Sequence, residues 1–195
     1  IVTTKKDSDK INDGLSNNYA LQYSMYPTEP LVLLFPNIYG GGSLNKSEIK
    51  VQELQDYNNY FYWGGIGYTA GPPYIGFLFG LIALIGFGFK NIKHRYWIGA
   101  AIILSILLSY GLYFESFNVF MLDHLPFYNK FRAPSMIMVI PTLLLGMMAV
   151  LSAQEIVHKF EENKESFLQK IKPALYITGA LFVIAFYFYA TQNFK

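Results

Sequence analysis

The 195-residue sequence contains no cysteine, which excludes disulfide scaffolds, cysteine-ligated zinc and iron–sulfur sites, and cysteine nucleophiles. Charge is scarce as well, since charged residues make up 14% of the chain and soluble domains carry about 25%. The chain is 53% hydrophobic and 18% aromatic, which excludes a disordered protein. Its formal net charge of +2 is too small to indicate a nucleic-acid partner. With a mean hydropathy of +0.27, the composition favours an integral membrane protein embedded in a lipid bilayer.

Four apolar runs are long enough to cross a bilayer, which takes about 17–25 helical residues. None of the four contains a charged residue in its interior. The sequence therefore predicts an all-α polytopic membrane protein with its transmembrane region over residues 73–190. The four transmembrane helices are expected at about residues 73–89, 96–114, 134–153 and 174–190.

The loops between these runs predict an orientation. The linker KNIKHR, between the first two runs, has three basic residues and no acidic one, and the linker between the third and fourth runs has four lysines. Short basic loops stay on the cytoplasmic side, so residues 1–72 and the loop 115–133 are expected to be extracytoplasmic. Because the first 30 residues are polar and contain no early apolar segment, we also expect the chain to be part of a longer protein.

Short interfacial segments are predicted within the two outer regions. The run LVLLF, closed by a Pro/Gly turn, is typical of a short helix or strand at the membrane surface. The run FNVFMLDHLPFY is typical of a re-entrant or interfacial helix that ends at Pro126.

The common soluble-enzyme motifs are missing from the sequence. It has no G-x-x-x-x-G-K-[ST] loop for nucleotide phosphates and no H-E-x-x-H zinc motif. The three histidines are scattered, so local spacing predicts no metal site. The catalytic residues, if the protein is an enzyme, stay unassigned at this point.

Lys130 and Arg132 stand out because they precede the third apolar run on the side that the positive-inside rule leaves poor in cations. An arginine at headgroup depth can bind a phosphate through two parallel hydrogen bonds, which makes this pair a candidate lipid-phosphate site. Asp123 and His124 in the same loop are candidate polar residues on the substrate side. The alternative is that the cations extend toward the headgroups or pair with Asp123.

Other candidates lie in the first outer region. Glu29 and Asn37 bracket the LVLLF segment, where the carboxylate either caps a short helix or orients a hydroxylated substrate and acts as a base. Tyr62 and Trp63 lie in an aromatic, glycine-rich stretch and either stack on a sugar ring or anchor the chain at the membrane interface.

Three blocks of the sequence resemble a known family. YALQYSMYPTEPLVLLFPNIYGG, YWGGIGYTAGPPYIG and LPFYNKFRAPSMIMV are similar to blocks of YfhO-like integral membrane proteins, in the form common in Bacteroidetes. Their order and spacing agree over roughly residues 15–155.

The resemblance implies part of a GT-C-type glycosyltransferase in the bacterial inner membrane. Such an enzyme transfers a sugar from a polyprenyl-phosphate carrier to an extracytoplasmic acceptor, with cations or a divalent metal ion stabilising the leaving phosphate. In GT-C enzymes the catalytic acid typically lies in the first outer loop, which the resemblance places outside this chain. The alternative is a non-enzymatic membrane subunit that packs with other subunits in a secretion or motility complex of the envelope.

Overall fold

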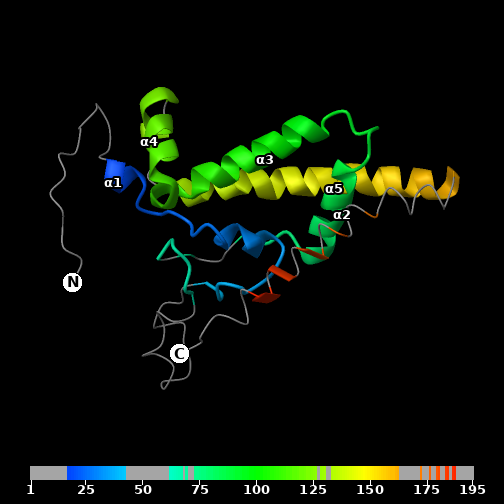
Figure 1. Cartoon of the computed structure of the whole chain (residues 1–195), viewed down its shortest axis with the longest axis horizontal. Helices are drawn as coiled ribbons and strands as arrows, with labels where there is room; N and C mark the ends of the chain where they lie inside the picture. The colour runs from blue at the N-terminus through cyan, green and yellow to red at the C-terminus, as the bar shows by residue number, and fades with distance from the viewer. Residues whose placement is uncertain are drawn as a thin grey trace, which may run out of the picture.

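The structure, a computed structural model, describes residues 17–42, 62–67, 69, 73–126, 128–130 and 133–162, and single positions between 172 and 187. The described residues are mostly helical (Figure 1). The α-helices are α1 (Asn17–Ala20), α2 (Phe77–Phe87), α3 (Arg95–Ser109), α4 (Glu115–His124) and α5 (Val139–Glu162). The 3₁₀ helices are η1 (Glu29–Leu33), η4 (Gly111–Phe114), η5 (Tyr128–Lys130) and η6 (Pro134–Met138).

Helix α5 is the long central element, and α2 and α3 both pack against it (Figure 1). The α2–α5 contact is close because Gly86 of α2 faces α5. A Cβ atom at Gly86 would overlap the Ser152 hydroxyl and lie 3.1 Å from Met148 Cε. The linker between α2 and α3 is also fixed, since Phe89 is buried and Asn91 Nδ2 donates to Glu155 Oε2 at 3.1 Å.

The main hydrophobic core lies where α2, α3 and α5 meet the segment 25–39. Apolar residues from all of these elements are buried together, which is the packing that stabilises short helices in a folded chain. The most deeply buried members are Met25, Val32, Ala83, Phe89, Ile98, Met138, Met148 and Ala149.

The prediction of four transmembrane helices is wrong for the described residues. One helix among them, Pro134–His158, is long and apolar enough to cross a membrane. A second span requires α3 to be counted together with Gly111–His124, although the two are bent by 108° at the break. The first predicted span contains the 11-residue helix α2, and most of the predicted fourth span, 174–190, lies outside the described residues.

The reason is that the first two apolar runs, 73–89 and 96–114, are longer than the helices α2 and α3 that they contain. At 1.5 Å per residue, 11 residues extend about 16 Å and 15 residues about 22 Å, both short of the ~30 Å hydrocarbon layer. Glycines end the helices inside the apolar runs: Gly76, with φ of 102°, precedes α2, and Gly88 follows it. Gly111, with φ of 45°, follows α3 and turns the chain into α4.

Both short segments expected in the outer regions form helices. The FNVFMLDHLPFY run contains most of α4, which begins at Glu115 and ends at His124, before Pro126. The LVLLF run forms η1, with Pro30 in its first turn.

The segment 21–26 is fixed between the loop after α3 and the start of η6. Met25 N–H donates to Ser109 O at 3.0 Å, and Ser135 N–H donates to Tyr23 O at 3.1 Å. The buried Ser24 hydroxyl accepts from Leu112 N–H at 2.8 Å and donates to Leu21 O at 2.6 Å. This segment connects the two regions described next.

Candidate functional site

Glu29 is a fully buried carboxylate, with 0% of its surface exposed. Its Oε2 accepts hydrogen bonds from Tyr26 N–H and from Gly65 N–H, both at 2.9 Å. Its Oε1 accepts from the Tyr62 hydroxyl, and that hydroxyl in turn accepts from Ile66 N–H at 3.4 Å. A buried charge is tolerated when hydrogen bonds replace its hydration, and here three donors do so.

These contacts correct the interpretation of Glu29. Its carboxylate accepts from Tyr26, Tyr62 and Gly65 rather than from the first amides of η1, so these contacts differ from those of a helix cap. A role in orienting a hydroxylated substrate stays a prediction. The carboxylate links the chain before η1 to the segment 62–67, because one oxygen holds an amide from each. Burial, together with the hydrogen bond to Glu29, raises the pKa of Tyr62 and keeps its hydroxyl protonated.

Tyr62 is thereby unavailable for stacking on a sugar, because its ring is 5% exposed. The neighbouring Trp63 is 38% exposed, and its backbone N–H donates to the backbone oxygen of Tyr39 at 3.2 Å. Asn37 is exposed in the following turn with φ of 59°, a conformation that asparagine tolerates better than most residues. Gly40 N–H donates to Asn37 O at 3.0 Å. The conformation of this turn is therefore sufficient reason for an asparagine at position 37.

Tyr26, whose backbone N–H donates to Glu29, forms a ring pair with Tyr113. The rings of Tyr26 and Tyr113 are 4.8 Å apart at an angle of 57°, within the range of favourable aromatic pairs. Their side chains are 37% and 47% exposed. Desolvation and a side-chain hydrogen bond with Tyr26 raise the pKa of Tyr113 to about 12, so its hydroxyl is neutral at physiological pH.

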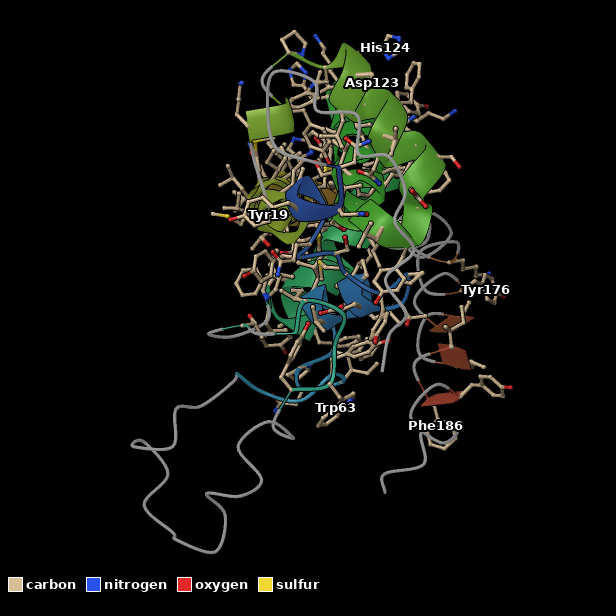
Figure 2. All side chains as sticks on the ribbon, turned by 90° about the vertical axis from the view of Figure 1, so that its left-hand side faces the viewer. Tyr19, Trp63, Asp123, His124, Tyr176 and Phe186 are labelled. Atoms are coloured by element: carbon tan, nitrogen blue, oxygen red, sulfur yellow. The ribbon has the colours of Figure 1, made fainter. Side chains whose placement is uncertain are left out.

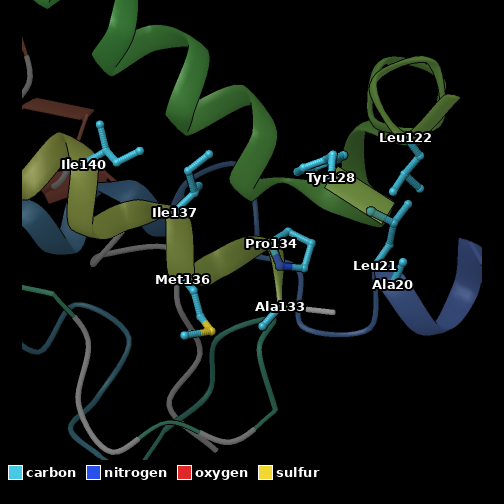
Figure 3. A pocket seen from close by; sticks show the side chains of 9 residues that line it. All are labelled: Ala20, Leu21, Leu122, Tyr128, Ala133, Pro134, Met136, Ile137 and Ile140. Carbon is cyan, nitrogen blue, oxygen red and sulfur yellow. The ribbon is translucent and has the colours of Figure 1, made fainter. Parts of the chain in front are cut away.

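An apolar hollow of about 410 Å³ opens between α1, α4, η5, η6 and the start of α5 (Figure 3). Its size falls within the range of small-molecule sites. Two of its lining residues remain exposed, Met136 at 74% and Ile140 at 41%, so the hollow opens on that side. The full lining is Ala20, Leu21, Leu122, Tyr128, Ala133, Pro134, Met136, Ile137 and Ile140.

Tyr128 is the one lining residue among these with a polar side-chain group. Its hydroxyl is engaged outside the hollow, donating to Asn118 Oδ1 at 2.9 Å and lying 3.4 Å from Leu108 O. Burial raises the pKa of Tyr128 to about 12. The walls therefore present hydrocarbon to any occupant.

The predicted phosphate-binding cations lie beside this hollow in the sequence. Lys130 ends η5, is exposed, and follows the lining residue Tyr128 by two positions. Arg132 directly precedes the lining residue Ala133 but lies outside the described residues. The cationic segment thus connects two walls of the hollow.

Asp123 and His124 lie far from the candidates in the first outer region. Figure 2 shows Asp123 and His124 at one end of the molecule and Trp63 near the other. His124 stacks on Phe120 at 4.2 Å, and its Nδ1 lies 2.8 Å from Phe120 O, so the ring contacts its own helix. Of the sequence candidates, Glu29 and Tyr62 are brought into contact.

Sequence reasoning missed the apolar hollow and the Tyr26–Tyr113 pair. The hollow combines residues from positions 20 to 140, which no local pattern connects. Tyr113 lies within the predicted span 96–114, whereas the structure turns the chain at Gly111 and places the Tyr113 ring beside Tyr26. Among the described residues, no group of three or more histidines and carboxylates could hold a metal ion.

Comparisons with known proteins give no match: no family model fits this chain, and neither a curated protein nor a solved structure is similar to it. The likeness to YfhO-like proteins thus stays a prediction from the three sequence blocks.

Proposed function

We propose that this chain is the lipid-binding part of a membrane glycosyltransferase of the GT-C type. It binds the polyprenyl-phosphate carrier of a sugar that is transferred to an extracytoplasmic acceptor. The observation that supports this most directly is the apolar hollow, whose walls connect through the segment containing Lys130 and Arg132. A prenyl phosphate has the same two parts, a hydrocarbon chain and an anionic head.

The surface around the hollow supports entry from a lipid phase. Only 33% of the most apolar window of Pro134–His158 is buried, so this helix is not a core helix enclosed by protein. Met136 and Ile140 belong to it and also line the hollow. A lipid tail enters the hollow sideways in this arrangement, while the head stays at the level of Lys130.

The test is photolabelling of the full chain in nanodiscs with a diazirine-bearing farnesyl phosphate. We expect label on peptides that line the hollow, competed by undecaprenyl phosphate. Replacing both cations (Lys130→Ala with Arg132→Ala) should lower the affinity for the prenyl phosphate about 10–100-fold, as expected for losing hydrogen bonds to a charged group. Labelling at a fixed probe concentration should fall accordingly. The matched control, Lys90→Ala with Lys93→Ala, removes two cations from the α2–α3 linker and should change nothing. Full labelling of the first double variant would contradict the proposal.

A second candidate, a non-enzymatic subunit of an envelope complex, is favoured by the exposed face of α5. Large apolar side chains there are 60–72% exposed and spaced by four and seven residues, at Val139, Leu143, Val150 and Val157. Such a stripe fits a partner helix as well as lipid. Recovery of a stoichiometric partner that is lost in Leu143→Lys, together with no labelling by farnesyl phosphate, would favour this candidate.

A further inference from the structure

The Tyr26–Tyr113 pair lies against the hydrogen-bonded groups around Glu29. Tyr26 N–H and Gly65 N–H share one oxygen of the buried Glu29. Gly65 in turn lies directly against the pair: a Cβ atom there would be 3.0 Å from Tyr26 N and 3.1 Å from Tyr113 Cε2. The buried carboxylate therefore fixes the backbone at Tyr26, and the absence of a side chain at Gly65 leaves room for the Tyr113 ring.

The second fixed point of the pair is the turn after α3. Gly111 directs η4 so that Tyr113 meets Tyr26, and Leu112 N–H donates to the Ser24 hydroxyl at 2.8 Å. The two rings come from positions 87 residues apart, yet both flank this one hydrogen bond. Positioning before binding lowers the entropy that a ligand contact would otherwise cost.

The chemistry of the pair combines flat apolar rings with neutral hydroxyls. Both tyrosines are more than a third exposed, and their hydroxyls are neutral at pH 7, as tyrosine hydroxyls ordinarily are. A pyranose ring has the matching character, since its C–H groups pack on aromatic faces and its hydroxyls exchange hydrogen bonds with phenols. A tyrosine that only anchors a protein at a membrane interface needs no such fixed geometry.

The pair lies next to the apolar hollow. Leu21, which lines the hollow, precedes Tyr26 by five residues, so their Cα atoms are at most about 18 Å apart. On the other side, Pro134 lines the hollow and its Cγ would be 3.2 Å from a Cβ at position 111, two residues before Tyr113. A ligand of modest length reaches both places.

We propose that Tyr26 and Tyr113 form a saccharide-binding site, which takes the hexose of a lipid-linked sugar whose tail occupies the hollow. This deepens the proposed function and rests on it. The site discriminates a prenyl-phosphate sugar from the bare prenyl phosphate.

The test compares two kinds of probe on the full chain in nanodiscs. They are farnesyl phosphate and a set of farnesyl-phosphoryl hexoses carrying glucose, galactose or mannose. The chain has two tryptophans, so Trp97→Phe leaves Trp63, two residues from Gly65, as the fluorescent reporter. We expect at least one hexose probe to bind about tenfold tighter than farnesyl phosphate, and only hexose probes to shift the Trp63 emission.

Variants separate this inference from the proposed function. Tyr26→Ala with Tyr113→Ala should lower hexose-probe affinity to that of farnesyl phosphate and leave farnesyl phosphate binding unchanged. Lys130→Ala with Arg132→Ala should weaken both probes. Tyr26→Phe with Tyr113→Phe keeps the rings in place and should lose part of the preference, whereas Tyr96→Ala, at an exposed tyrosine of α3, should lose none.

Four results would overturn the inference. If farnesyl phosphate binds but no hexose probe binds tighter, the saccharide site is absent while the proposed function stands. If the preference survives in the alanine double variant, the site lies elsewhere. If empty vesicles alone shift Trp63, the pair is an interfacial anchor. Binding of neither probe would overturn the proposed function and this inference together.

Discussion

The Glu29 contacts and the apolar hollow are two neighbouring regions built on opposite principles. Around Glu29, polar groups are buried and each finds a partner, so hydrogen bonds set the positions of Tyr26 and Gly65. In the hollow, the walls are hydrocarbon, and the one polar side chain in its described lining directs its hydroxyl elsewhere. Directional bonds fix geometry, whereas apolar packing without full occupancy leaves space.

This contrast predicts different tolerance to change. A hydrogen-bonded buried cluster loses stability sharply when a central group is removed, because the remaining donors stay buried without acceptors. A partly empty apolar region accepts added volume, which the close-packed core does not.

The largest effect is expected for Glu29→Ala. It leaves Tyr26 N–H, Gly65 N–H and the Tyr62 hydroxyl without their acceptor, and at about 1–3 kcal/mol for each orphaned group the free energy of unfolding should fall by about 4 kcal/mol. Denaturant titration in detergent micelles measures this. The control Glu115→Ala removes an exposed carboxylate in the first turn of α4 and should cost less than about 1 kcal/mol. Equal losses in the two variants would show that the buried cluster does not fix this region.

An intermediate effect separates the hollow from the packed core. Ala133→Leu adds volume at the hollow and should change the free energy of unfolding by less than about 1 kcal/mol, while it reduces farnesyl phosphate labelling. Ala149→Leu adds the same volume at a position that is 2% exposed in the core and should cost about 1–3 kcal/mol. Thermal unfolding of both variants gives the comparison. A larger loss at Ala133 would mean that the hollow is not space for a ligand.

The sequence predicted much of the helical content but not where helices end. The apolar runs located α2, α3 and α5, and the Pro126 boundary located α4. What the runs could not show is that Gly76, Gly88 and Gly111 interrupt them, because hydropathy treats a glycine at a helix end like one inside a span. Four transmembrane helices were therefore predicted where the described residues contain one span-length helix.

The candidate site was predictable in composition rather than in arrangement. Glu29 and Tyr62 were both selected, yet their contact joins residues 33 positions apart, which no local period indicates. Tyr113 was not selected, since it lies near the end of the predicted span 96–114, and only the turn at Gly111 brings its ring to Tyr26. Long-range contacts decided both roles.

The smallest effect concerns Tyr128, which joins the wall of the hollow to Asn118 of α4. Its pKa is raised to about 12 by burial, whereas an unfolded tyrosine titrates near 10. The folded state therefore holds the proton more tightly, and this contribution to stability is complete below about pH 10 and declines as the pH rises toward 12. Tyr128→Phe should cost about 1 kcal/mol at pH 7, because Asn118 Oδ1 loses its donor. Since phenylalanine does not titrate, the stability difference between variant and wild type should shrink between pH 10 and 12, measured by denaturant titration at each pH. A difference that stays constant over that interval would show that the phenol is hydrated, and that the wall of the hollow is polar at this point after all.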